Sequence, residues 1–269
     1  MGAIIPNRLD PASSLSAHSC CPVPGRATAT SHNGSRRPYI DVSFPMSLSR
    51  SLLRLAGFAG GALLGLRLHW FRQPRPWPRQ LASWLDSDLR RRWLDPASLL
   101  DPIGVQPGMH VLEVGCGTGV VTEELARRVG EQGTVTALDI QMELIQRARA
   151  RLREAGLADR VRFLFTDTDG APLDPQSADL IVLGSVLGEI PDPHPMLTTL
   201  FGVAKPESRL AIYEEPLMPG ALSPAMAQMH LHAAGFRRGG HIRQLTHWLG
   251  VYYRDGDEWD PDLKPGTIL

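Results

Sequence analysis

Apolar and polar positions along the chain change period several times, and each change predicts the end of one element and the start of the next. Val111–Val114 is a short apolar run of the kind that forms a buried strand, and apolar residues recur with helical spacing over 120–129. Nearly continuous apolar runs are typical of strands buried on both faces of a parallel sheet. The same alternation predicts an α/β fold, with further strands at 134–139, 160–165, 179–187, 209–213, 241–246 and 248–253.

Three glycines, Gly115, Gly117 and Gly119, stand between the first predicted strand and its helix. Glycine lets the backbone turn sharply and approach a ligand without a Cβ in the way, and the following helix N-terminus favours electron-rich ligand atoms. A dinucleotide site requires a further Gly or Ala, but Val120 or Thr122 stands there, depending on the frame. The spacing therefore disfavours a dinucleotide.

An acidic residue, Glu113, stands two places before the first of these glycines. The string from Glu113 to Gly119 resembles the first motif of the class I S-adenosylmethionine (AdoMet)-dependent methyltransferases. The resemblance extends over about 79–254, and the segments 77–86, 186–193 and 233–236 are similar to a loosely characterised bacterial group that acts on small molecules. It implies a Rossmann-like, doubly wound, seven-stranded and mostly parallel sheet, with the last strand pair antiparallel.

Acidic residues also follow the second and third predicted strands. Asp139 lies about 20 residues beyond the glycine loop, where a ribose-binding carboxylate belongs, although it could instead cap the helix beginning near Met142. Asp167 resembles the family's adenine-binding acid, the alternative being an ordinary turn residue. The resemblance implies AdoMet as cofactor, with contacts from Glu113, Gly115, Cys116, Gly117, Gly119, Asp139, Ile140, Asp167, Thr168 and Gly184.

The loop after the fourth predicted strand should face the transferred methyl group, because ligands of such sheets lie beyond the carboxyl ends of the strands. An oxygen or nitrogen nucleophile must lose a proton, which calls for a nearby base. Glu189 and His194 are the candidate catalytic residues by position. The alternatives are a loop acid that binds backbone amides, for Glu189, and a surface residue between two prolines, for His194.

These residues predict an enzyme that transfers a methyl group from AdoMet, by in-line displacement, to a small and lipophilic acceptor. The alternative is a non-catalytic AdoMet-fold protein that binds or assembles with a partner. The chain has 28 Lys and Arg against 28 Asp and Glu, so we expect no nucleic-acid partner. Its 3 cysteines give neither a disulfide framework nor the spacing of metal ligands. The oligomeric state stays open.

The N-terminal third divides into segments of different composition. Residues 1–45 are rich in Ser, Pro and Arg and read as a disordered leader or a misassigned start. Residues 46–78 contain an apolar run at 51–71 and a linker of alternating prolines, so we expect the methyltransferase domain at 79–269 to fold independently of them. The run could be a lid or arm, or it could contact a membrane surface, which would make a cytoplasmic protein peripheral to the membrane.

Overall fold

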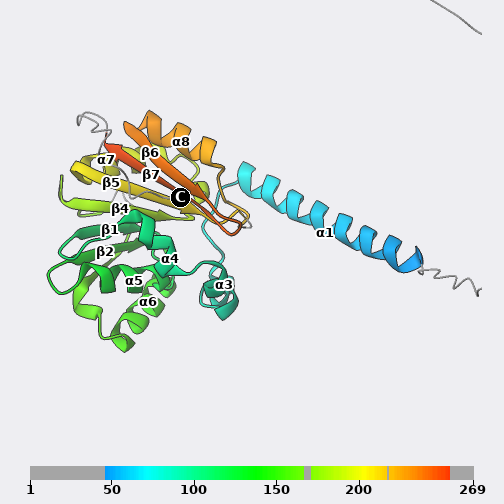
Figure 1. The fold of residues 1–269 in the computed structure, drawn as a ribbon, viewed down its shortest axis with the longest axis horizontal. Coiled ribbons are helices and arrows are strands. Elements are labelled where there is room, and N and C mark those ends of the chain that lie inside the picture. Colours follow the sequence, from blue (N-terminus) through cyan, green and yellow to red (C-terminus); the bar gives the residue numbers. More distant parts are fainter. Residues whose placement is uncertain (1–45, 167–170, 217, 255–269) are drawn as a thin grey trace, which may run out of the picture. The chain divides into compact units, whose positions relative to one another are not determined.

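The computed structural model of the chain describes residues 46–166, 171–216 and 218–254 (Figure 1). The chain divides into two compact units, residues 1–48 and 49–269, and the fold given below is that of the second. The predicted leader at 1–45 and two of the predicted cofactor contacts, Asp167 and Thr168, lie outside the described residues.

A seven-stranded sheet forms the centre of the domain, in the order β3-β2-β1-β4-β5-β7-β6. All pairs are parallel except those of β7, which is antiparallel to both β5 and β6. This arrangement confirms the predicted fold class. The strands are β1 (His110–Val114), β2 (Thr134–Asp139), β3 (Val161–Phe165), β4 (Ala178–Gly184), β5 (Ala204–Glu214), β6 (Phe236–Arg243) and β7 (Trp248–Arg254).

Helices cover both faces of the sheet (Figure 1). Successive strand residues point to opposite faces, and Val111 and Leu112 accordingly belong to two different core clusters. One cluster draws on α4 (Pro96–Leu100), α5 (Val120–Val129) and α6 (Met142–Glu154), and the other on α7 (His194–Val203) and α8 (Pro224–Ala233). The chain leaves β1 toward β2 and β3 and later crosses back to β4, so the strand order reverses between β1 and β4. Ligands of doubly wound sheets bind at this switch point.

Two strands begin earlier than the pattern predicts. β5 starts at Ala204 rather than near 209, because the segment before the predicted strand pairs with β4 across an irregular register. β6 starts at Phe236 rather than 241, and Arg237 and Arg238 within it are exposed. β6 is an edge strand, where exposed charged side chains are tolerated and discourage pairing with other chains, and these charges hide the apolar pattern of a strand.

The segment 81–94 has an apolar spacing typical of an amphipathic helix, but it forms two short helices. A 3₁₀ turn, η1 (Arg79–Leu81), leads into α2 (Ala82–Leu85), and α3 (Asp88–Trp93) follows. The break occurs at Ser87, whose side chain accepts a hydrogen bond from the Arg90 amide and so caps α3. Serine favours such N-cap positions over helix interiors, which explains why the helix restarts there.

The apolar run lies in a long helix, α1 (Met46–Arg72). Ser51–Arg72 is long and apolar enough to cross a membrane by length and composition, with a mean hydropathy of 1.3, and its most apolar part is not buried in the protein. Among the described side chains of α1, those of its last turns contact the domain. The Trp70 ring is buried beside Gly220, and the Arg67 guanidinium donates hydrogen bonds to the carbonyls of Pro216 and Ala221.

Candidate active site

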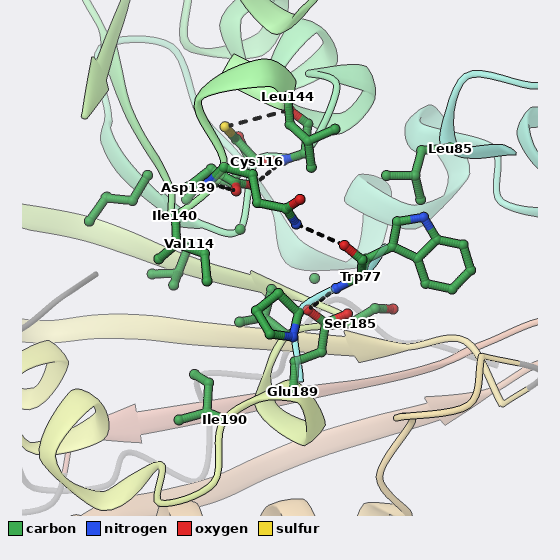
Figure 2. A pocket seen from close by; sticks show the side chains of 18 of the residues that line it. Trp77, Leu85, Val114, Cys116, Asp139, Ile140, Leu144, Ser185, Glu189 and Ile190 are labelled. Atoms are coloured by element: carbon green, nitrogen blue, oxygen red, sulfur yellow. Dashed lines mark hydrogen bonds between the residues drawn. The ribbon is translucent and has the colours of Figure 1, made fainter. Parts of the chain in front are cut away.

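A cavity of about 430 Å³ lies at the carboxyl ends of the central strands. Its walls come from the loops after β1, β2 and β4, from the end of β5, and from the chain segment that follows α1 (Figure 2). It occupies the switch point of the sheet, where the sequence placed its cofactor contacts. In Figure 2, Asp139 and Cys116 lie on one side of the cavity, and Glu189, Ser185 and Ile190 lie on the other.

Gly115 and Gly119 serve close packing within the protein. Both have positive φ, 78° and 80°. A Cβ on Gly115 would lie 2.0 Å from a methyl carbon of Val186, and one on Gly119 would lie 2.8 Å from the Cβ of Ala148. Gly119 does not line the cavity, whereas Gly115 does. These two glycines therefore fix the loop against β4 and α6.

Of the three glycines in the loop, Gly117 is the one with open space in front of its Cα. Its φ is 53°, and a Cβ built on it would contact only the Leu85 Cδ1, at an ordinary distance of 3.8 Å. It lines the cavity, so the space in front of it is open to a ligand. We call this part of the cavity, which is lined by Glu113, Gly117, Asp139 and Ile140, the cradle. A Cβ on Gly117 would begin to fill it, so it fits a cofactor that lies directly against the backbone.

The Asp139 carboxylate ends β2 and joins the loop to the next turn. Its Oδ2 accepts a hydrogen bond from the Gly117 amide at 2.9 Å, and its Oδ1 accepts one from the Gln141 amide at 2.8 Å. Burial raises the pKa of Asp139 above its usual value, while these hydrogen bonds act against the rise. Asp139 is not the N-cap of α6, because that position belongs to Gln141. The carboxylate lines the cavity and can accept further hydrogen bonds there.

Glu113 is buried beneath the same loop. The Thr122 hydroxyl donates a hydrogen bond to its Oε2 at 2.6 Å. Burial raises the pKa of Glu113 to about 7, and the Asp139 charge contributes in the same direction. No cation faces this carboxyl among the described residues. A cationic ligand group at this end of the cavity would therefore be stabilised by it.

The Cys116 thiol lines the cavity but is not a reactive group. It is buried, and burial together with the charges of Glu113 and Asp139 raises its pKa well above the usual value. The thiolate is the nucleophilic form of cysteine, so Cys116 has a packing role. Ile140, by contrast, is half exposed at the cavity edge, where its apolar side chain offers a surface to a flat ligand group.

The proline-rich segment lines the cavity, although the sequence was interpreted as giving a linker there. We call residues 74–77 the strap. The Trp77 amide donates a hydrogen bond to Glu189 Oε2, and the Trp77 carbonyl accepts one from Gln141 Nε2, both at 3.0 Å (Figure 2). The strap therefore connects the loop after β4 with the turn after β2. The predicted domain boundary between residues 78 and 79 stays a prediction, but residues 74–77, which precede it, line the cavity.

The half of the cavity beside the loop after β4 contains residues that the sequence did not single out. Ser185 has a positive φ of 53°, and the Arg90 guanidinium forms a short ion pair with Glu215. Arg90 resembled its neighbours in a run of three arginines, and periodicity alone does not tell which of them points inward. Tyr213 lies over Gly184, where a Cβ would come within 2.2 Å of its hydroxyl. The apolar lining includes Trp77, Ile190, Pro191, Met196 and Met218.

One of the two candidate catalytic residues is not at the cavity. His194 is exposed at the start of α7, and its backbone amide donates a hydrogen bond to Asp192. Glu189 does line the cavity, and burial raises its pKa to about 8. Within the described ranges, no group of His, Cys, Asp and Glu side chains is arranged to hold a metal ion.

Comparison with known proteins gives a consistent result. The sequence profile of a methyltransferase domain matches residues 105–235. The ubiquinone/menaquinone biosynthesis C-methyltransferase of Idiomarina loihiensis is 34% identical over 115 residues, which are 43% of this chain and 46% of that protein. The enzyme of the same name from Vibrio vulnificus is 32% identical over 115 residues, 43% and 44% of the two chains. The chain thus spans less than half the length of these curated relatives.

A solved structure extends the similarity to the whole domain. The SAM-dependent methyltransferase of Aquifex aeolicus superimposes with a TM-score of 0.62 at 28% identity, over 66% of this chain and 98% of that one. SAM is the same cofactor as AdoMet. The fold, the glycine loop, the profile and these relatives agree with one another. The chain belongs to the class I AdoMet-dependent methyltransferases.

Proposed function

We propose that the protein transfers a methyl group from AdoMet to a small, lipophilic acceptor. The observation that carries this proposal is a continuous cavity that extends from the glycine loop to the loop after β4, where Ile190, Pro191 and Met196 add apolar surface. A cofactor in the first half and an acceptor in the second would lie next to each other. Nothing in the described part of the chain favours the non-catalytic alternative, because the cradle is open and its carboxyls are in place.

The residues of the cradle fit AdoMet. Glu113, which lacks a cation, would bind its ammonium group, and Asp139 would accept hydrogen bonds from the ribose hydroxyls. Gly117 would let the backbone lie against the ligand, and Ile140 would pack on the base. When bound, AdoMet supplies a methyl group on a positively charged sulfur, which departs as a neutral thioether. Asp167 and Thr168 remain predicted contacts of the adenine end.

The protein's own contribution is to hold the acceptor in line and to keep water out. Fixing two reactants in attack geometry can lower the barrier by about 7–11 kcal/mol. The apolar side chains of Ile190, Pro191 and Met196 in the cavity wall favour an acceptor with an apolar body, and the relatives named above are C-methyltransferases of quinone biosynthesis. We therefore infer that the acceptor is an aromatic alcohol or reduced quinone rather than a sugar or a peptide.

We further propose that this cytoplasmic protein contacts a membrane surface through residues 51–71. Large apolar side chains of this segment are exposed around the helix, among them Leu53 at 71% and Phe58 at 80%. A helix that is apolar all round needs an apolar environment. The charge-free stretch 55–66 is about 18 Å long, shorter than the ~30 Å hydrocarbon core. It is bracketed by Arg54 and Arg67, so we expect shallow insertion rather than spanning.

Two experiments test these proposals separately. Calorimetry should show AdoMet binding to the full chain, and a panel of naphthohydroquinone, benzohydroquinone and phenols with short alkyl tails should include a compound that is methylated. Binding of NAD in place of AdoMet would overturn the assignment. Flotation with phosphatidylglycerol vesicles should carry the protein upward, and replacing Leu53, Phe58 and Leu63 by Asn should abolish flotation without altering AdoMet affinity. Equal flotation of both proteins would exclude residues 51–71 as the site of membrane contact, and no flotation of the wild type would exclude the contact altogether.

A further inference from the structure

Glu189 reaches the acceptor half of the cavity from the 3₁₀ turn η4 (Leu187–Glu189), directly after β4. Its Oε2 accepts the hydrogen bond from the Trp77 amide at 3.0 Å. In the described part of the chain, this amide is the one hydrogen-bond donor to the Glu189 carboxyl. The strap therefore fixes one carboxyl oxygen of Glu189, and the other remains available to a ligand in the cavity (Figure 2).

The ionisable groups around Glu189 are mostly acidic. Asp139 faces it from the end of β2, and Glu214 faces it from the end of β5. Glu214 is itself buried, and its Oε1 has no hydrogen-bond partner. The cations in this region contact other groups. Arg67 of α1 lies toward Glu214, Arg90 of α3 pairs with Glu215, and Arg75 of the strap contacts the His69 and Trp70 side chains. Glu189 is thus a carboxyl without a cation of its own.

We propose that Glu189 is the catalytic base that removes the acceptor's proton, and that the Trp77 amide is the positioning group that orients its carboxyl. This inference rests on the proposed function. As the acceptor gains the methyl group, one O–H, N–H or C–H bond of the acceptor breaks. Its electron pair stays on the acceptor, and the proton passes to the Glu189 carboxylate, which becomes a carboxylic acid. Solvent takes up the proton after the product leaves.

The environment suits this task. A base works best when its pKa lies near the working pH, and burial beside Asp139 raises the pKa of Glu189 to about 8. An ordinary surface carboxylate would be too weak a base for a phenol or an aromatic C–H. Because the Trp77 carbonyl also accepts from Gln141, the strap that orients the base is attached next to Asp139 of the cofactor cradle. The strap thus contacts both halves of the cavity, and its hydrogen bond to Glu189 orients the base.

The test uses the full chain and the Glu189→Gln variant, with Glu154→Gln as the control, since Glu154 is exposed at the end of α6. Infrared difference spectra over a pH titration should show a protonated carboxyl that loses its proton near pH 8. This signal should vanish in Glu189→Gln and persist in Glu154→Gln. AdoMet affinity should stay within about twofold of wild type, whereas turnover of the methylated panel compound should fall by about 10²–10⁴-fold.

The positioning group has its own readout. Trp77→Pro removes the amide hydrogen, and Trp77→Ala keeps it, so only the proline variant should lose turnover beyond the loss of the side chain. Glu189→Gln with near wild-type turnover, or a carboxyl signal that survives this substitution, would overturn the inference. A wild type that binds AdoMet but methylates no panel compound would instead count against the acceptor class, and the infrared result would still decide the state of Glu189.

Discussion

Arg90 and Glu215 form a two-point ion pair above the acceptor half of the cavity. Arg90 Nη2 lies 2.6 Å from Glu215 Oε1, Arg90 Nε lies 3.2 Å from Oε2, and each side chain is only 11% exposed. Arg90 also donates a hydrogen bond to the Leu85 carbonyl at 3.2 Å. Bidentate pairs of this geometry combine strength with a fixed orientation. The pair therefore attaches α2 and α3 to the end of β5.

The first prediction concerns this pair. Glu215→Gln leaves the Arg90 guanidinium buried without a counter-charge and should lower the free energy of unfolding by about 3–5 kcal/mol, as measured by urea denaturation. The matched control is Asp88→Asn, which breaks the exposed pair with Arg91 on the same helix. Exposed pairs contribute little, so the control should unfold close to the wild-type midpoint. Equal midpoints for all three proteins would mean that the Arg90–Glu215 pair is not structural.

The second prediction separates the glycines of the loop. Gly117→Val should leave a cooperatively folded domain that no longer binds AdoMet, because its side chain enters the cavity rather than the protein. Gly156→Val is the control for backbone strain, since Gly156 has a similar φ of 69° with open space around it and does not line the cavity. Calorimetry should show unchanged affinity in the control. A Gly117→Val protein that binds normally would show that the ligand lies elsewhere.

The third prediction concerns Asp139. Asp139→Ala should weaken AdoMet binding by about 1.5–3 kcal/mol, the range for hydrogen bonds to a charged group. It should also lower stability, because two backbone amides lose their acceptor. Asp179→Ala is the matched control: Asp179 accepts from the His110 amide at 2.8 Å at the opposite end of the sheet. The control should lose stability without losing affinity, and equal losses of affinity would contradict the assignment.

The fourth prediction follows from the pKa of Glu113, which burial raises to about 7. A cationic ligand favours the ionised form, so AdoMet affinity should rise with pH up to about 7 and then level off, and below that pH it should fall by up to about tenfold per pH unit. Without ligand, the stability of the folded state depends on pH with the opposite sign. The folded state holds a proton that the unfolded chain has released, so stability should decline from about pH 4.5 to about pH 7.

Calorimetry and urea denaturation across this pH range check both statements. Glu113→Gln should flatten the Glu113 part of each profile, while Glu143→Gln, at an exposed position of α6, should leave both unchanged. An affinity that is independent of pH in the wild type would mean that the ammonium group is bound elsewhere.

The fifth prediction concerns the strap. A chain beginning at Gln73 keeps residues 74–77 and should bind AdoMet as the full chain does. A chain beginning at Arg79 loses the Trp77 contacts to Gln141 and Glu189 and should bind more weakly. This differs from the sequence-based expectation that the prolines uncouple the N-terminal arm from the domain. Equal affinities of the two shortened chains would restore that expectation.

The central part of the site was predictable because its signals are local. The strand, the glycines and the helix that hold the cofactor cradle follow one another over 111–129, and their order alone implies the turn. Glu189 was also found by its place after β4. The strap was not, because its role depends on a hydrogen bond between residues 112 positions apart. An alternating proline pattern looks the same in a free linker as in a segment fixed to a cavity wall.

The acidic cavity lining has a consequence for turnover. Glu113, Asp139, Glu189 and Asp192 line the cavity, against Arg75 and an Arg90 already neutralised by Glu215. The sulfur of AdoMet carries a positive charge, which is gone once the methyl group has been transferred. The attraction that draws the charged donor in is therefore weaker for the spent thioether. The ammonium group and the ribose hydroxyls, which we assign to Glu113 and Asp139, are the same in the thioether. The by-product should therefore keep those contacts and compete with fresh donor, with an affinity lowered only by the loss of the charge on sulfur.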